Sequence, residues 1–186
     1  MEIRYLRTVV AGLIVAATIS IAGGNAGATE AQPTAPTHSL TLPSSIALGL
    51  VAVDYETQVA PGRGLQVSPQ LVLAKVDGQY TAGAVGVGLT YRFYFNGQTI
   101  KGWYAGPTAR LVYLRVANDD VTAHGVGGQA GAVLGWKGVW GGFTFDWRAG
   151  YGVSYNMLTA SSGSFSASQG TLSTVPMGDI SLGYSW

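Results

Sequence analysis

Residues 140–157 alternate between bulky apolar side chains and small or polar ones along almost their whole length. Phe143 and Phe145 fall on one face, and Thr144 and Asp146 fall on the other. Successive side chains of a β-strand point to opposite faces, so a period of two predicts a strand. Strands usually have about five or six residues, whereas about 9–11 are needed to cross a bilayer at a tilt. The segment is therefore long enough to cross a membrane.

The same alternation recurs over 80–95, where Val85 and Val87 stand opposite Gly86 and Gly88. An even number of strands brings both ends of a barrel chain to the same side. Pro43 makes the first expected strand the least regular, because proline has no N–H to donate. The strands that we expect are 38–44, 46–58, 64–75, 80–95, 101–116, 124–137, 140–157 and 173–186.

The sequence is poor in charge, since 10% of its residues are Asp, Glu, Lys or Arg, whereas soluble domains average about 25%. Water solvates a surface with so few charges poorly. No segment after the amino-terminal region has the roughly 18 consecutive apolar residues of a transmembrane helix. A closed barrel crosses a bilayer with half-apolar strands, because its ladder satisfies every backbone N–H and C=O. We therefore predict an all-β fold, a single antiparallel up-and-down transmembrane β-barrel of about eight strands.

A soluble ligand-binding barrel is the alternative, with the bulky face inside and a glycine-rich, weakly charged face outside. Water would solvate that outer face poorly, so we favour the orientation in which the bulky face contacts lipid. The 28 glycines then fit a narrow lumen. The formal net charge of +1 does not favour nucleic-acid binding, and the absence of cysteine excludes disulfides and thiolate metal sites.

The amino terminus has the three parts of a secretory signal peptide. Residues 1–7 contain two arginines, residues 8–24 are almost wholly apolar, and Ala26 and Ala28 place small residues before a cleavage site. An uncleaved membrane anchor is the alternative. We expect a cleaved signal peptide at 1–28, a flexible periplasmic leader at 29–37 and a transmembrane barrel at 38–186, integral to the bacterial outer membrane.

The links between the expected strands differ in length. Those at 59–63, 96–100 and 138–139 are short, whereas those at 117–123 and 158–172 are longer and polar. Alternate links of a barrel lie on the same side, so we expect the long ones to face the outside of the cell. The last of them is rich in Ser, Gly and Thr, which suits a mobile loop.

Charged residues on the expected strands fall on the small, polar face, which would face the lumen. A charge in a narrow lumen must be paired or hydrated, so we expect a ladder of salt bridges and hydrogen bonds that plugs the barrel. A gated or selective narrow pore is the alternative. Equal numbers of acids and bases argue against a strong ion preference. The expected lumenal network is Asp54, Glu56, Arg92, Arg110, Lys137, Asp146, Arg148 and Asp179.

Apolar side chains near the carboxyl terminus occupy every second position, and an aromatic residue comes last. This arrangement predicts a closing strand with an apolar outer face that ends in an aromatic girdle. It also resembles the carboxyl-terminal signal by which bacterial outer-membrane barrels are recognised by their assembly machinery. The residues of this expected signal are Ile180, Leu182, Tyr184 and Trp186. Further aromatic residues that we expect to face outward are Trp103, Trp136, Trp140, Trp147, Tyr151 and Tyr155.

The sequence contains no motif of a catalytic or metal site. Its histidines, His38 and His124, lie far apart and have no cysteine or suitably spaced carboxylate beside them. A G-x-S-x-G motif is absent, and the G-x-G-x-x-A match at 125–130 enters a strand instead of a helix. We expect His124 to face water in an outer loop. We therefore expect no enzyme activity, no cofactor and no bound metal.

Short motifs add a resemblance to known barrels. They are Tyr55-Glu56, Arg92-Phe93-Tyr94-Phe95 and Gly102-Trp103-Tyr104-Ala105-Gly106-Pro107. With them, the chain from about residue 40 to 186 resembles the small eight-stranded outer-membrane barrels of the OmpA transmembrane-domain and OmpW type, and more closely an uncharacterised family of bacterial barrels.

The function that we expect is that of a structural or interaction protein of the outer membrane, with a plugged lumen. Its expected partners are outer-membrane lipid and, during biogenesis, the barrel-assembly machinery, with no nucleic acid. The sequence does not identify a partner for the outer loops. A narrow pore for small or hydrophobic solutes is the first alternative, and a lipid-modifying enzyme is a distant one.

Overall fold

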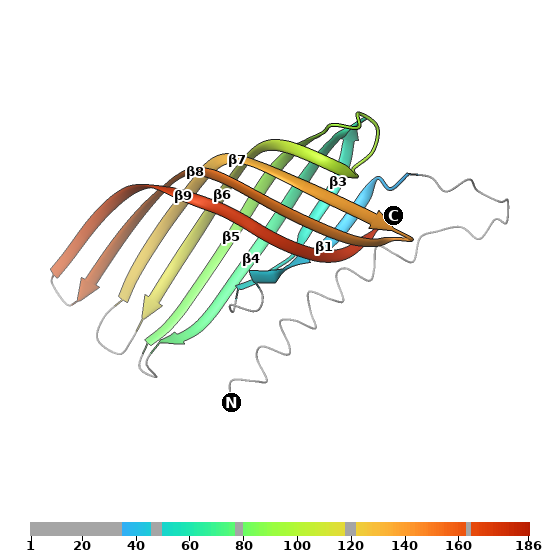
Figure 1. Cartoon of the computed structure of the whole chain (residues 1–186). Coiled ribbons are helices and arrows are strands. Elements are labelled where there is room, and N and C mark those ends of the chain that lie inside the picture. The colour runs from blue at the N-terminus through green and yellow to red at the C-terminus, as the bar shows by residue number, and fades with distance from the viewer. Residues whose placement is uncertain (1–34, 46–49, 77–79, 118–121, 163–164) are drawn as a thin grey trace. The chain divides into compact units, whose positions relative to one another are not determined.

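The computed structural model describes residues 35–45, 50–76, 80–117, 122–162 and 165–186. Its strands are antiparallel and belong to a single sheet (Figure 1). They are β1 (His38–Pro43), β2 (Leu50–Ala52), β3 (Asp54–Ala60), β4 (Arg63–Val76), β5 (Tyr80–Tyr94), β6 (Gly102–Ala117), β7 (Thr122–Trp140), β8 (Phe143–Ser162) and β9 (Phe165–Ser185). The predicted signal peptide at 1–28 and most of the predicted leader at 29–37 lie outside the described residues.

The sheet closes on itself. Both β2 and β3 pair with β4, and only Val53 separates them, so together they form one interrupted strand. The first strand, β1, pairs with β3 on one side and with β9 on the other. The β4–β5 pairing completes a ring of eight strands, counting β2 and β3 as one. The predicted all-β, up-and-down barrel of about eight strands is therefore confirmed.

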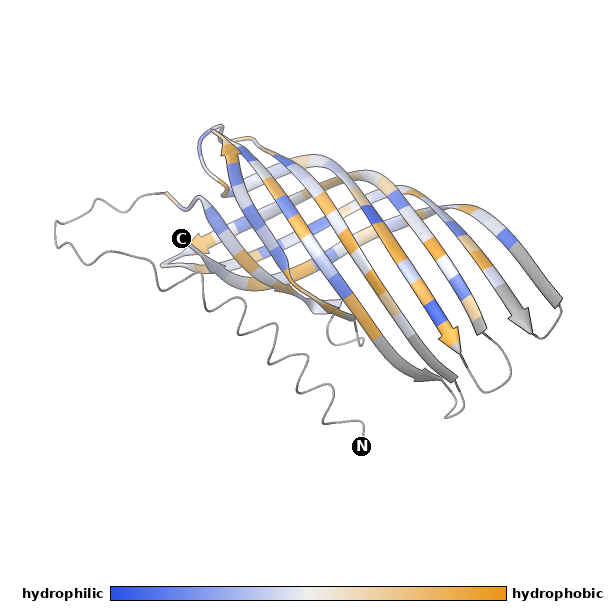
Figure 2. Cartoon of the chain, turned by 180° about the vertical axis from the view of Figure 1, so that it is seen from behind, coloured by the Kyte–Doolittle hydropathy of each residue, from blue (hydrophilic) through white to orange (hydrophobic). Residues whose placement is uncertain are grey.

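Side chains alternate between the lumen and the outer surface. On β5, Val85, Val87 and Leu89 are exposed on the outside, whereas Thr90 and Arg92 are buried inside. Figure 2 shows hydrophobic and hydrophilic residues following one another along the strands. The bulky apolar face of the barrel thus points outward, which is the opposite of a soluble ligand-binding barrel.

None of the described residues belongs to a helix with the length and apolar character needed to cross a membrane.

Tight turns join the strands at the end of the barrel near the carboxyl terminus. Gly141 and Gly142 connect β7 to β8, with φ angles of 56° and 89°. A two-residue hairpin of type I′ requires positive φ at both positions, which glycine adopts without steric cost. The predicted link at 138–139 is therefore wrong, because those residues belong to β7 and the glycine pair after them makes the turn. The predicted links at 59–63 and 96–100 do contain turns.

The opposite end carries long paired hairpins. The β8–β9 ladder continues as far as Ser162 and Phe165, and the β6–β7 ladder extends in the same way. The predicted mobile loop at 158–172 is therefore wrong, because nearly all of it belongs to strands. Of the predicted loop at 117–123, residues 118–121 lie outside the described part and the others belong to β6 and β7. An antiparallel ladder bonds backbone to backbone, so Ser, Thr and Gly extend a strand when a partner lies beside it.

Glycines on the inward face leave space for large side chains. A Cβ atom at Gly135 would lie 2.5 Å from the hydroxyl oxygen of Tyr104, and one at Gly131 would overlap the side chain of Met177. Real Cβ atoms do not approach other atoms this closely. These positions of the wall must therefore be glycine for the lumen to hold a tyrosine and a methionine beside them.

Candidate functional site

The eight charged residues predicted to face the lumen all occupy inward positions. Asp54 and Glu56 on β3, Arg92 on β5, Lys137 on β7 and Asp146 on β8 are buried. The side chains of Arg148 and Asp179 keep 12% of their surface exposed. Seven of the eight share ion pairs with one another. The eighth, Arg110 on β6, forms no ion pair with any described residue and lines the lumenal cavities instead.

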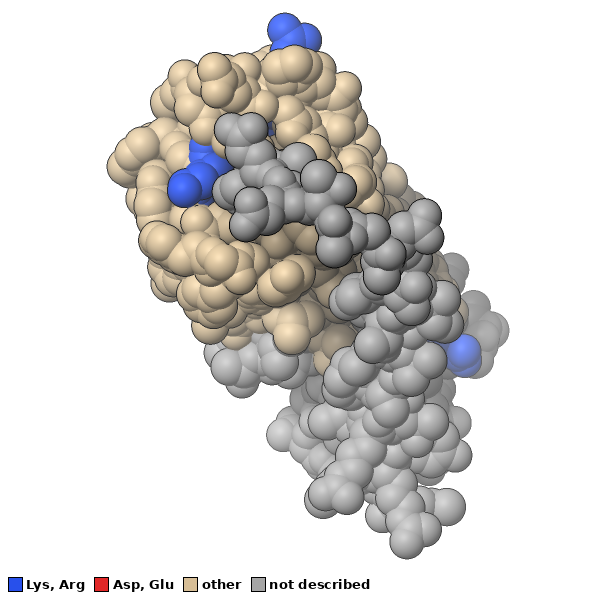
Figure 3. All heavy atoms as spheres, turned by 90° about the vertical axis from the view of Figure 1, so that its right-hand side faces the viewer, with Lys and Arg blue, Asp and Glu red and all other residues tan. Residues whose placement is uncertain are grey.

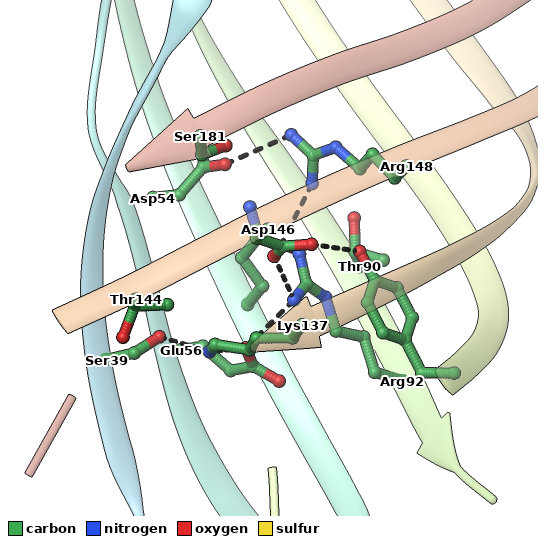
Figure 4. A network of polar contacts seen from close by, with 12 residues as sticks. Ser39, Asp54, Glu56, Thr90, Arg92, Lys137, Thr144, Asp146, Arg148 and Ser181 are labelled. Atoms are coloured by element: carbon green, nitrogen blue, oxygen red, sulfur yellow. Dashed lines mark hydrogen bonds and ion pairs between the residues drawn. The ribbon is translucent and has the colours of Figure 1, made fainter. Parts of the chain in front are cut away.

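The innermost group of charges lies near the end of the barrel that carries the tight turns, because Arg92 is close to the end of β5 and Lys137 to the end of β7. Figure 4 shows this group. Arg92 Nη1 donates to Glu56 Oε2 at 3.0 Å and to Asp146 Oδ2 at 2.6 Å. Lys137 Nζ donates to the same Glu56 oxygen at 2.6 Å and to Ser39 Oγ at 2.5 Å. One carboxylate thus bridges two cations, and one guanidinium bridges two carboxylates.

A second group lies beside the first. Arg148 Nη2 is 3.1 Å from Asp54 Oδ2 and 3.5 Å from Asp179 Oδ2. Arg148 and Asp179 are direct cross-strand partners in the β8–β9 register. Gln66 on β4 connects the two groups, because its Oε1 accepts hydrogen bonds from both Arg148 and Arg92.

Two tyrosines complete the inner group, and the sequence analysis did not place them in the lumenal network. Tyr94 donates from its hydroxyl to Glu56 Oε1, and Tyr104 donates to Asp146 Oδ1, both at 2.8 Å. The Arg92 guanidinium carbon lies 4.3 Å from the centroid of the Tyr104 ring, within the range of a cation–π contact. The alternation on β5 could have predicted that Tyr94 faces the lumen, since Tyr94 lies on the same face as Arg92. Gln66 and Tyr104 likewise occupy even-numbered inward positions of β4 and β6.

Apolar side chains close the space next to these tyrosines. Tyr94, Ile100, Tyr104 and Val133 form a buried cluster, against which Met177 packs. Ile100 belongs to the connection between β5 and β6 and has no exposed surface. This connection is held against the barrel end, because Gln58 Nε2 donates to the Gln98 carbonyl at 2.7 Å. We call Glu56, Arg92, Tyr94, Tyr104, Lys137 and Asp146 the lumenal plug.

The lumenal plug spans the full width of the barrel. Three strands separate β3 from β7 in either direction around the ring, so the Glu56–Lys137 pair joins opposite walls. Both side chains are almost completely buried, at 2% and 0% exposure. Buried charges are tolerated only when they are paired and hydrogen-bonded, and these are. Direct side-chain contacts therefore cross the lumen at this level.

Beyond the lumenal plug, toward the long hairpins, the lumen is partly empty. Cavities of about 40 and 80 Å³ lie around Arg110, Arg148 and Asp179. A larger cavity of about 220 Å³ lies farther along, lined by Arg110, Gln129 and Asn156 among others. Arg110 lines all three cavities.

Acidic side chains are confined to the interior in the described part of the chain, where the acids are Asp54, Glu56, Asp146 and Asp179. Figure 3 views the end that carries the carboxyl terminus, and Lys and Arg atoms but no Asp or Glu atoms are visible on that face. Arg63 and Arg115 are exposed on the outer side of β4 and β6. The guanidinium carbon of Arg63 lies 6.0 Å from the ring centroid of Phe93.

The expected outward aromatic residues lie on the outer face. Trp103, Trp140, Tyr151 and Tyr155 are each about half exposed, at 48%, 55%, 60% and 52%. Trp136 and Trp147 are partly covered by aromatic neighbours, Trp140 and Trp103 respectively. The residues of the expected carboxyl-terminal signal are exposed on the outside of β9 or just after it, namely Ile180, Leu182, Tyr184 and Trp186.

Both histidines lie on the outer surface beside tyrosines. His124 is part of β7, and its Nδ1 is 2.7 Å from the Tyr113 hydroxyl. The prediction that His124 lies in a loop is therefore wrong, since the β6–β7 ladder extends past it. His38 Nδ1 is 3.0 Å from the Tyr55 hydroxyl, and its ring stacks on Trp186. Within the described ranges, no three His, Cys, Asp or Glu residues are grouped so as to hold a metal ion.

No model of a known protein family matches the sequence, and no curated protein matches it. Among solved structures, the chain is similar to the crystal structure of CarO from Acinetobacter baumannii, with 13% sequence identity and a TM-score of 0.43. The alignment covers 84% of this chain and all of that one.

Proposed function

We propose that this chain is an integral β-barrel of the bacterial outer membrane, with its termini in the periplasm and its long hairpins outside the cell. The closed ladder supports this, because it leaves no strand edge with unpaired backbone groups. The apolar outer face supports it as well, since bulky residues such as Leu89, Leu111 and Tyr151 are exposed there. Strands of 14 to 21 residues from β4 to β9 exceed the roughly 9–11 that cross a bilayer.

Its role in this proposal is structural or interactive, with a lumen that does not conduct. The observation that carries the proposal is the lumenal plug, in which Glu56, Arg92 and Lys137 are at most 2% exposed and bond across the barrel. Ion conduction through an eight-stranded barrel requires a continuous column of water, and the lumenal plug interrupts that column. The long hairpins then form the part available to partners outside the cell.

Planar-bilayer recordings of the refolded barrel test the closed lumen. We expect no discrete conductance steps from the wild-type protein. An Arg92→Ser/Glu56→Ser variant removes one cation and one anion together. The charges that remain, Lys137 and Asp146, are cross-strand neighbours of opposite sign, and we expect this variant to conduct. Regular conductance steps from the wild-type protein would show that the plug is not a seal.

Location is tested separately, by fractionating cells that express the full chain and comparing boiled with unboiled samples on a gel. We expect a band in the outer-membrane fraction whose mobility shifts on heating, and a mature amino terminus at Thr29. A soluble protein with an unshifted band would overturn the membrane proposal.

A narrow pore is the second candidate. The observation in its favour is the series of cavities around Arg110, which reaches from the plug toward the hairpin end. If the protein is a narrow pore, the lumenal plug acts as its gate. The wild-type protein would then conduct only under conditions that disrupt the ion pairs of the plug. The recordings above distinguish the two candidates.

A further inference from the structure

From the layer of Arg110 toward the hairpin ends, the inward face changes from polar to more apolar residues. In the register from β5 to β9, this cross-strand layer is polar and contains Gly88, Arg110, Gln129, Ser154 and Ser173. The next layer toward the hairpin ends contains Gly86, Val112, Gly127, Asn156 and Thr171. The layer after that contains Ala84, Leu114, Gly125, Leu158 and Gln169. The inward residues thus change along the barrel axis. The layer of Arg110 is polar, and the two layers beyond it contain Val112, Leu114 and Leu158.

The two leucines occupy inward positions on either side of Gly125. A Cβ atom at Gly125 would be 2.7 Å from Leu158 Cδ2 and 3.6 Å from Leu114 Cβ, so both side chains border the space over this glycine. Leu158 is 50% exposed although it is on an inward position. The sequence analysis expected small and polar residues on this face, and these leucines depart from that pattern. An apolar group in the lumen would cover them.

The cavity along these layers holds about 220 Å³ and is lined by Arg110, Val112, Gln129, Ser154 and Asn156, together with two glycines. We call this space the outer cup. Arg110 is the sole charged residue in its described lining. Asp54 and Asp179 line the neighbouring 80 Å³ cavity on the plug side instead. Arg110 therefore places a positive charge at the plug-side end of the outer cup.

We propose that the outer cup binds a small organic carboxylate with a short apolar tail. A guanidinium matches a carboxylate with two parallel hydrogen bonds, which places the acid group on Arg110. The amides of Gln129 and Asn156 supply further donors, and Val112 lines the same space. Leu114 and Leu158 lie one inward layer farther toward the hairpin ends, where the end of the tail would reach them. The volume is below the roughly 300–1,000 Å³ of sites for drug-sized ligands, so the ligand is small.

Binding of radiolabelled hexanoate to the barrel in lipid nanodiscs tests this proposal, with empty nanodiscs subtracted. We expect saturable binding of hexanoate, and no saturable binding of hexylamine, which has the same number of carbon atoms and the opposite charge. Arg110→Gln is expected to weaken hexanoate binding about tenfold to a hundredfold, the usual effect of losing a charged hydrogen bond. Arg115→Gln is the matched control, because Arg115 is on the same strand but faces outward, and we expect it to bind like the wild type.

Equal losses from Arg110→Gln and Arg115→Gln would overturn the proposal, as would hexylamine binding as tightly as hexanoate. If Arg110→Gln does not fold, Val112→Ser decides the matter, because it should weaken hexanoate binding and leave acetate binding unchanged. If Val112→Ser then binds hexanoate as tightly as the wild type does, the proposed contact between Val112 and the tail is refuted. The outcome is independent of the proposed closed lumen, since hexanoate binding and conductance are measured separately.

Discussion

Replacing Glu56 by glutamine is the sharpest test of the lumenal plug, because it keeps the shape of the side chain and removes its charge. Glu56 accepts hydrogen bonds from Arg92 at 3.0 Å, Lys137 at 2.6 Å and Tyr94 at 2.8 Å. After Glu56→Gln, Arg92 still has Asp146 at 2.6 Å. Lys137 would have no carboxylate left among its described hydrogen-bond partners. The substitution therefore leaves a buried ammonium group without a counter-charge.

Removing one partner of a buried ion pair costs about 3–5 kcal/mol of unfolding free energy. We expect about 3 kcal/mol here, the lower end, because the glutamine oxygen still accepts one hydrogen bond and Arg92 remains paired. That corresponds to a folded-to-unfolded ratio lower by about a factor of 100, and to a urea midpoint lower by about 1–3 M.

The assay is urea titration of the barrel in lipid vesicles, followed by the gel mobility of unboiled samples. Adding Lys137→Met to Glu56→Gln removes the unpaired ammonium group, and we expect this to restore about 2 kcal/mol relative to Glu56→Gln alone. Asp179→Asn is the matched control, because Arg148 keeps its shorter contact to Asp54. We expect this control to cost about 1 kcal/mol or less.

Two results would refute this reasoning. If Glu56→Gln unfolds within about 0.5 kcal/mol of the wild type, the usual scale for a surface substitution, then the charge of Glu56 does not stabilise the barrel. If Lys137→Met makes the Glu56→Gln variant less stable still, the cost of the first substitution does not come from the unpaired ammonium group.

Two further predictions concern the wall and the rim of the barrel. A Cβ atom at Gly64 would lie 3.1 Å from the carboxyl carbon of Glu56 and overlap its Oε1, so Gly64→Ala should lower the unfolding free energy by about 1–3 kcal/mol. Gly128→Ala, whose nearest neighbour would be 3.6 Å away, should be neutral in the same urea titration. Trp186→Ala should reduce the heat-modifiable barrel recovered from cells without changing refolding into vesicles, if the carboxyl terminus is an assembly signal. Trp140→Ala, an exposed tryptophan outside that signal, should leave the recovery from cells unchanged, and equal losses from both would contradict that role.

The strands and their two faces could be predicted from the sequence because alternation is a local property. Residues 143–157 carry the pattern without a break, and their inward and outward positions are those of β8 in the structure. The ends of strands could not be placed so well. Ser and Thr between 158 and 172 have no alternation to recognise, and the pairing of β8 with β9 is what makes this segment a hairpin.

The lumenal charges could be assigned to one face, but their partners could not. Which cation meets which carboxylate depends on distances across the ring, and the sequence contains no measure of them. Lys137 and Asp146 are cross-strand neighbours, yet Lys137 bonds to Glu56 on the opposite wall. The same three-dimensional arrangement leaves Arg110 beside Asp54 and Asp179 in a lumenal cavity without an ion pair to either of them.

Each of the three short motifs behind the resemblance to known barrels supplies both faces of the wall. Tyr55, Phe93 and Trp103 are exposed on the outside, at 38%, 44% and 48%. The residue that follows each of them in the chain points inward, and these residues are Glu56, Tyr94 and Tyr104 of the lumenal plug. Because the period of a strand is two, an insertion of one residue would exchange the two faces. The outward-facing aromatic residues and the lumenal plug are therefore fixed in register by the same dipeptides, so a motif of this kind constrains the outer surface and the plug together.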